Sequence, residues 1–87
     1  MGYKVLYSDA AKATLRKLDR QVAARILKFM DRVAALQDPR SIGEALHGNL
    51  RDYWKYRAGD WRIICDIQDA RIIVRVLRIG NRRDIYR

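Results

Sequence analysis

In the first half of the chain, apolar residues recur every three or four positions, which is the period of an amphipathic helix. Residues 10–18 carry a short stripe, and residues 20–36 carry a longer one, formed by Val22, Ile26, Phe29, Met30, Val33 and Leu36. Ser8 and Asp19 precede the two stripes, and their side chains can cap free N–H groups of a first helical turn. Asp38-Pro39 follows the second stripe, and proline cannot continue a helix. The pattern predicts a helical hairpin over residues 8–36.

Elsewhere the pattern has the period of two that is typical of strands, and it predicts strands at residues 3–7, 53–57, 61–67 and 71–79. Ala58-Gly59-Asp60 and Gln68-Asp69-Ala70 have the composition of turns. Residues 40–52 have no clear period and are interpreted as a connector, and Gly80 is expected to end the last strand. The order is β-α-α-β-β-β. The expected fold class is α+β, with the helical hairpin packed on a mainly antiparallel sheet.

Alternation divides the side chains of the predicted hairpin between two faces. Lys55 and Arg57 point to one side, and Trp54 and Tyr56 point to the other. If Arg62 shares the side of Lys55 and Arg57, one face is apolar and the opposite face carries clustered positive charge. A core needs only the apolar face, so the basic face is the candidate for function. Two interpretations of the tryptophans at 54 and 61 remain open: packing beneath the sheet, or stacking on nucleic-acid bases.

The distribution of charge supports the second half of the chain as a binding region. The chain of 87 residues has 19 Lys and Arg against 10 Asp and Glu, a net charge of +9, and 14 of the basic residues are Arg. Residues 71–87 contain six Arg and one Asp, a net of +5. This density favours a polyanionic partner, for which Arg is the better bidentate donor.

Length and the remaining composition set limits. Eighty-seven residues are enough for one domain, expected to span residues 1–87. No run of about 18 apolar residues and no secretory signal is present, so the expected location is the cytoplasm, with no membrane partner.

The usual catalytic and metal-binding motifs are missing from the sequence. One cysteine, Cys65, and one histidine, His47, cannot form a disulfide framework or a familiar zinc site. There is no glycine-rich phosphate loop, and the acidic residues are too scattered for a two-metal nuclease. No metal and no cofactor are therefore expected, and Cys65 is interpreted as a small buried apolar residue.

Three stretches together resemble a known family: Leu46-His47-Gly48-Asn49-Leu50, Tyr53-Trp54-Lys55-Tyr56-Arg57-Ala58-Gly59-Asp60-Trp61-Arg62-Ile63-Ile64 and Ile79-Gly80-Asn81-Arg82-Arg83-Asp84-Ile85-Tyr86. They are similar to the RelE/ParE toxin superfamily of bacterial toxin–antitoxin systems, with the nearer likeness to the RelE branch. The predicted order of elements agrees with this family over nearly the whole chain.

The resemblance implies a toxin that enters the ribosomal A site and cleaves bound mRNA without a metal, by attack of the 2′-OH on the adjacent phosphate. It also implies a cognate antitoxin protein as partner. By position, the residues that match the family's catalytic site are Lys55, Arg62, Arg82 and Tyr86. A base must accept the 2′-OH proton, and either Lys55 or Tyr86 has suitable chemistry, since a lysine among other cations releases its proton more readily.

The remaining basic residues are candidates for holding the RNA phosphates: Arg57, Arg75, Arg78 and Arg83. The sequence departs from the family at two positions, with Tyr53 in place of a second lysine and Asn81 where relatives often have histidine. Two alternative functions stay open: a ParE-like poison of DNA gyrase that cuts no nucleic acid, and a non-catalytic basic module that binds nucleic acid.

Overall fold

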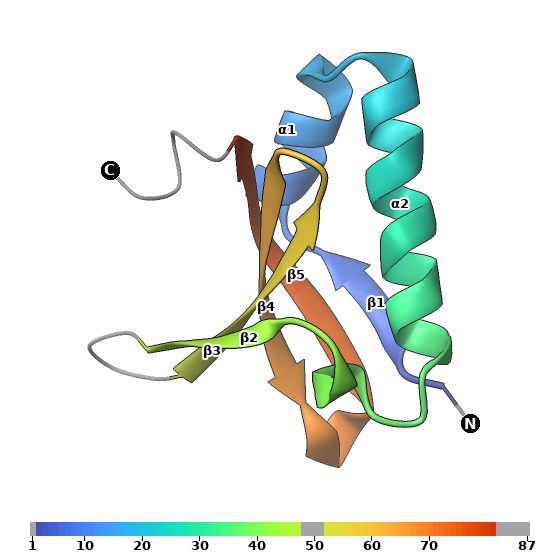
Figure 1. The fold of residues 1–87 in the computed structure, drawn as a ribbon, viewed down its shortest axis with the longest axis vertical. Coiled ribbons are helices and arrows are strands. Elements are labelled where there is room, and N and C mark those ends of the chain that lie inside the picture. Colours follow the sequence, from blue (N-terminus) through green and yellow to red (C-terminus); the bar gives the residue numbers. More distant parts are fainter. Residues whose placement is uncertain (1, 48–51, 82–87) are drawn as a thin grey trace.

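Two helices pack on one five-stranded sheet in the computed structural model, which describes residues 2–47 and 52–81 (Figure 1). Its elements are β1 (Lys4–Tyr7), α1 (Asp9–Lys17), α2 (Arg20–Ala35), β2 (Glu44–His47), β3 (Asp52–Ala58), β4 (Trp61–Gln68) and β5 (Ile73–Asn81), with short 3₁₀ helices at Pro39–Ser41 and Asp69–Arg71. The strand order is β1-β5-β4-β3-β2. Only β1 pairs in parallel, with β5, and the other pairs are antiparallel. The α+β prediction is confirmed.

Both predicted helix caps are present. The Ser8 hydroxyl accepts a hydrogen bond from the Ala11 N–H at 3.0 Å, and the Asp19 carboxylate accepts one from the Gln21 N–H at 3.1 Å. Each satisfies one of the N–H groups that a first turn leaves free. The helices therefore begin where the sequence predicts, and α2 ends before Asp38-Pro39.

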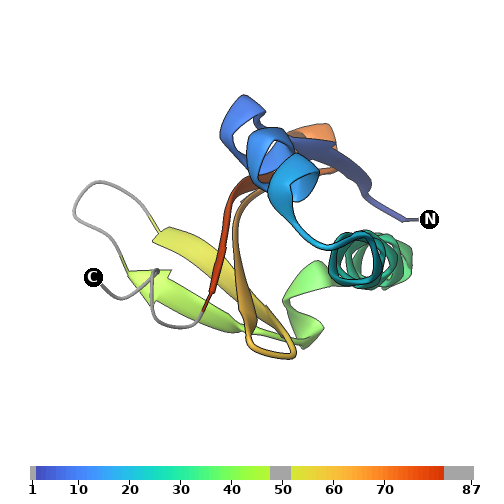
Figure 2. The same cartoon turned by 90° about the horizontal axis from the view of Figure 1, so that it is seen from above.

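The apolar stripes of the helices cover one face of the sheet, and α1 and α2 lie on the same side of it (Figure 2). The fully buried side chains of this layer include Ile26, Met30 and Val33 from α2. Tyr56, Ile63, Cys65, Val74 and Val76 from the strands are also 0% exposed. The interpretation of Cys65 as a buried apolar residue is confirmed, and burial raises the pKa of its thiol. Within residues 2–47 and 52–81, no helix is long and apolar enough to cross a membrane.

The connector prediction for residues 40–52 is wrong in part, because residues 44–47 form the edge strand β2. This strand has too few residues for a period to appear in the sequence. The last strand is also shifted. It begins at Ile73, because Ile72 turns the chain with φ 57°, and it continues through Gly80 to Asn81.

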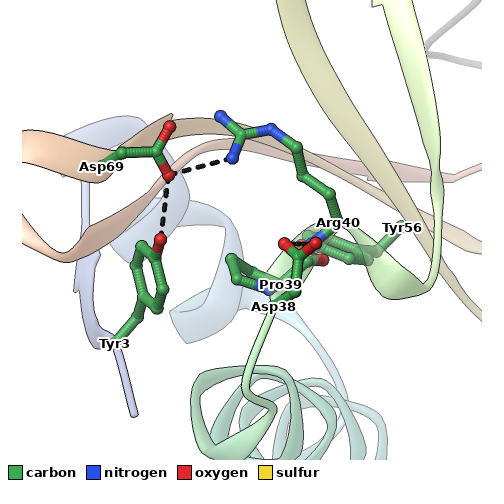
Figure 3. A network of polar contacts seen from close by, with 6 residues as sticks. All are labelled: Tyr3, Asp38, Pro39, Arg40, Tyr56 and Asp69. Carbon is green, nitrogen blue, oxygen red and sulfur yellow. Dashed lines mark hydrogen bonds and ion pairs between the residues drawn. The ribbon is translucent and has the colours of Figure 1, made fainter. Parts of the chain in front are cut away.

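A polar network joins Tyr3, Arg40 and Asp69 at one end of the sheet (Figure 3). One carboxylate oxygen of Asp69 accepts hydrogen bonds from the Tyr3 hydroxyl at 2.8 Å and from the Arg40 guanidinium at 2.9 Å. Asp38 accepts a hydrogen bond from the Arg40 N–H. The hydrogen bond from Arg40, followed by that from Tyr3, lowers the pKa of Asp69 below its ordinary value of 3.8. The network thus links Tyr3, the residue before β1, to both 3₁₀ segments.

This lowered pKa gives a pH-dependent contribution to stability. A carboxylate with a lower pKa in the folded state stabilises the fold above its unfolded pKa, and this stabilisation is lost as pH falls through the folded value. We expect Asp69→Asn to lower the melting temperature at pH 7, because a neutral amide holds Arg40 less strongly. Thermal unfolding across pH should show the difference from wild type closing in strong acid. A difference that stays constant with pH would contradict the role of the charge.

Candidate functional site

The side of the sheet that faces away from the helices carries the predicted basic residues. Register places Arg57 of β3 directly opposite Arg62 of β4, and Arg62 opposite Gly80 of β5. The neighbouring row across the sheet consists of Glu44, Lys55, Ile64 and Arg78. Side chains that are directly opposite share a face, so Lys55, Arg57 and Arg62 lie on one side, a condition that the sequence left open. We call this surface, formed by Lys55, Arg57, Arg62, Arg75 and Arg78, the basic face.

Glu44 joins two members of the basic face. Its Oε1 atom lies 3.1 Å from the Lys55 ammonium and 3.3 Å from the Arg57 guanidinium. Lys55 is 7% exposed, whereas the side chain of Arg57 is 63% exposed. The hydrogen bond from Lys55 is the main cause that lowers the pKa of Glu44. Lys55 is therefore held in place by a charged partner, while Arg57 remains accessible to a ligand.

The close approach of Gly43 sets this arrangement. Gly43 has φ 84°, and a Cβ there would lie 2.6 Å from the Trp54 Nε1 atom and 2.7 Å from the Lys55 carbonyl oxygen. Only glycine fits so near to β3 in this conformation. The chain consequently enters β2 with Glu44 next to Lys55. The indole N–H of Trp54 donates to the Ile42 carbonyl at 2.8 Å and so also holds the segment around Gly43 against β3.

Arg62 is a buried cation with incomplete pairing. It is 7% exposed, and one terminal nitrogen donates to the Gly59 carbonyl at 3.1 Å and more weakly to the Trp61 carbonyl at 3.4 Å. Its Nε atom is buried and has no hydrogen-bond partner. Among the residues that the structure describes, no carboxylate lies within ion-pair distance of this guanidinium. Such a group is costly in a resting protein, so Arg62 is a candidate for contact with an anion.

Gly59 positions Arg62 through the hairpin turn. It has φ 63°, as the predicted turn over Ala58-Gly59-Asp60 requires, and its carbonyl receives the Arg62 hydrogen bond. Two like charges directly opposite one another in a sheet destabilise the fold. The pair of Arg57 and Arg62 is therefore a candidate for anion binding.

Arg75 and Arg78 reach the basic face because β5 contains an irregularity. Ile64 is opposite Arg78, but the next residue, Cys65, is opposite Val76, so Leu77 is an extra residue. Without this bulge, side chains three positions apart would point to opposite faces. Arg78 lies in the same row as Lys55. Arg75 is opposite Asp66, about 13 Å along the strand from Arg62 at roughly 3.3 Å per residue.

Tyr56 and the two tryptophans lie on the opposite side from the cations. Tyr56 is 0% exposed, and its hydroxyl donates to the Pro39 carbonyl at 2.5 Å (Figure 3). Trp54 and Trp61 are half-buried against the core. The packing interpretation of the two tryptophans is confirmed, and neither presents its ring on the basic face. Tyr53, which replaces a family lysine, is half-buried on β3.

Three of the predicted site residues, Arg82, Arg83 and Tyr86, lie outside the described residues. Glu44 was not predicted, since only the register of β2 brings it to Lys55. The stretch Glu44-Ala45-Leu46-His47 does not alternate between polar and apolar residues, so no local signal marked this strand. Within residues 2–47 and 52–81, no three His, Cys, Asp or Glu side chains gather to hold a metal ion.

Comparison with known proteins places this chain in a family. Residues 5–86 match the sequence family described as the ParE toxin of type II toxin-antitoxin system, parDE. Toxin RelG of Mycobacterium tuberculosis (strain ATCC 25618 / H37Rv) is 30% identical over 87 residues, which cover 100% of this chain and 99% of the relative. Toxin RelE of the same strain is 28% identical over 85 residues, which cover 98% and 87%.

Comparison with solved structures agrees with the sequence comparison. The crystal structure of the toxin-antitoxin complex RelBE2 from Mycobacterium tuberculosis contains a chain that is similar with a TM-score of 0.83 and 26% identity, over 97% of this chain and 95% of that one. The chain therefore belongs to the RelE/ParE superfamily and is a toxin of a type II toxin–antitoxin system.

Proposed function

We propose that this toxin is a metal-independent endoribonuclease that cleaves mRNA on the ribosome. The observation that carries the proposal is the buried, incompletely paired guanidinium of Arg62 directly opposite Arg57. Two relatives that span nearly the whole chain are named RelG and RelE, which supports the RelE-like branch of the family. The basic face supplies what phosphate chemistry needs, which is several cations held near one point.

The proposed reaction is a transesterification. The 2′-oxygen attacks the adjacent phosphorus, the bond from phosphorus to the 5′-oxygen breaks, and the products are a 2′,3′-cyclic phosphate and a 5′-hydroxyl. One of Lys55, as its neutral amine, and Tyr86, as its phenolate, accepts the 2′-OH proton, and the leaving 5′-oxygen takes a proton from the other of the two in its protonated form. The hydrogen bond to Glu44 fixes the position of the Lys55 ammonium. Orientation of a reacting group in this way lowers the entropic part of the barrier.

Arginine stabilises the charge that develops on phosphorus. The pentavalent phosphate carries more negative charge than the substrate, so cations in fixed positions favour the transition state. Arg62 is fixed by the Gly59 carbonyl and so requires little reorganisation. Arg57, Arg82 and Arg62 are proposed to share this charge. Arg75, Arg78 and Arg83 hold the flanking phosphates and contribute mainly to binding.

A separate antitoxin protein is the second proposed partner. The solved RelBE2 relative is a toxin–antitoxin complex. A chain with a net charge of +9 is suited to an antitoxin with an acidic or amphipathic segment. The proposed site of action is the cytoplasm, where ribosomes translate the message.

One observation favours a second candidate function: the matching family carries the ParE description. Induction of the gene, followed by sequencing of the ends of cellular mRNA, separates the two. We expect new mRNA ends inside translated reading frames. DNA breaks with intact mRNA would favour a gyrase poison instead, and no effect on growth, mRNA or DNA would leave a simple binding module.

A further inference from the structure

A cavity of about 380 Å³ opens beside the basic face, at the edge of β3. Glu44 and Lys55 form the last pair between β2 and β3, so β2 does not cover the edge of β3 beyond this point. The cavity lies in that gap. Its apolar wall consists of Phe29, Ile42 and Tyr56, and its charged rim consists of Glu44, Lys55 and Arg57. A mostly apolar cavity with a few convergent polar groups is the usual form of a small-molecule site.

The walls of the cavity are held rigidly. Phe29 and Tyr56 pack edge to face with ring centroids 5.9 Å apart. The Tyr56 hydroxyl is fixed by the Pro39 carbonyl, as Figure 3 shows. Ile42, at 42% exposed, presents apolar surface to solvent. The volume falls within the roughly 300–1,000 Å³ of typical ligand sites.

The rim indicates the chemistry of the occupant. Both ion pairs of Glu44 use the Oε1 atom, which leaves Oε2 to accept a hydrogen bond from a ligand. Arg57, which also lines the cavity, has an exposed guanidinium that can hold a phosphate at its mouth. A phosphate at the rim places the attached nucleoside within reach of the cavity. Hydrogen-bond donors on that base would face the carboxylate.

We propose that this cavity binds a nucleobase next to the cleaved phosphate and that Glu44 selects bases with an exocyclic amino group. The inference rests on the proposed function, because it takes RNA to be the ligand of the basic face. Adenine, cytosine and guanine each present an amino donor to the carboxylate. Uracil has carbonyl oxygens at its exocyclic positions, so only its ring N3–H could donate to the carboxylate, and the carbonyl oxygens on either side of that N–H would face a negative charge, which is disfavoured.

The test is an NMR titration of the purified full chain with the 3′-monophosphates of adenosine, cytidine, guanosine and uridine, which differ only in the base. We expect shifts at the amide signals of Gly43 and Glu44, and binding of uridine monophosphate about tenfold weaker than that of the other three. In Glu44→Gln the amide can also donate to uracil, so the difference should shrink to about twofold or less. Ile42→Ala should weaken all four nucleotides alike, since the apolar wall touches every base.

Asp60→Asn is the matched control, because it removes one negative charge from an exposed turn that does not line the cavity. It should keep the tenfold difference. Equal binding of all four nucleotides to wild type, or shifts confined to other parts of the molecule, would overturn the base site. If the wild-type toxin shows the base preference but does not cleave mRNA on the ribosome, the proposed function is wrong and the base site stands. If the wild-type toxin cleaves mRNA on the ribosome but binds all four nucleotides equally, the base site is wrong and the proposed function stands.

Discussion

Replacement of Arg62 with alanine is expected to lower single-turnover cleavage of ribosome-bound mRNA by roughly 10²–10³-fold, the loss seen when one transition-state donor is removed. The guanidinium is buried, fixed by the Gly59 carbonyl and directly opposite Arg57. Ribosome binding should change far less, because the other cations of the basic face still contact phosphates. The measurement is the single-turnover rate with ribosomes in excess, together with the dissociation constant.

Two further variants make this result specific. Arg62→Lys keeps a positive charge but loses the planar fork of donors, so we expect it to recover only a small part of the rate. Arg32→Ala removes the same charge from the exposed side of α2 and should cleave at the wild-type rate. Melting temperatures of the variants identify any loss of fold. If Arg62→Ala and Lys55→Ala both cleave as fast as wild type, the proposed active face is wrong.

The second large effect is on folding. Val33 is 0% exposed, in the layer between α2 and the sheet. Val33→Asp buries an unpaired carboxylate, which costs several kcal/mol or forces the group to take up a proton. A domain of this size has a free energy of unfolding of only about 5 kcal/mol or a little more. We therefore expect the variant to be unfolded at pH 7 by circular dichroism and to show no cooperative thermal transition.

Ala24→Asp is the matched control for this variant. Ala24 is exposed on the same helix, so the new carboxylate stays in water and the cost is limited to helix propensity, about 0.7 kcal/mol or less. A cooperative transition for Val33→Asp close to that of Ala24→Asp would contradict the packing of α2 on the sheet.

Much of this fold follows from period and caps in the sequence. Ser8 and Asp19 mark both helix starts because a side-chain cap is a local interaction. Alternation along β3 separates Lys55 and Arg57 from Trp54 and Tyr56, since a strand has only two faces. These features depend on neighbouring residues, so they can be predicted without knowledge of the tertiary structure.

The remaining features depend on pairing between distant segments. β2 has four residues, and the contact of Glu44 with Lys55 exists only through its register with β3. The extra residue Leu77 brings Arg75 and Arg78 to one face, although simple alternation would separate them. Register and bulges are therefore what the sequence pattern could not supply.

The most direct test of the account is the reaction of the purified toxin with ribosomes that hold a defined mRNA in the A site. We predict one cut within the A-site codon, with a 2′,3′-cyclic phosphate on the upstream fragment and a 5′-hydroxyl on the downstream fragment. EDTA, at a level that leaves the ribosomes intact, should not change the rate of the cleavage step. Intact mRNA after prolonged incubation, or fragments that end in a 3′-hydroxyl and a 5′-phosphate, would contradict the account.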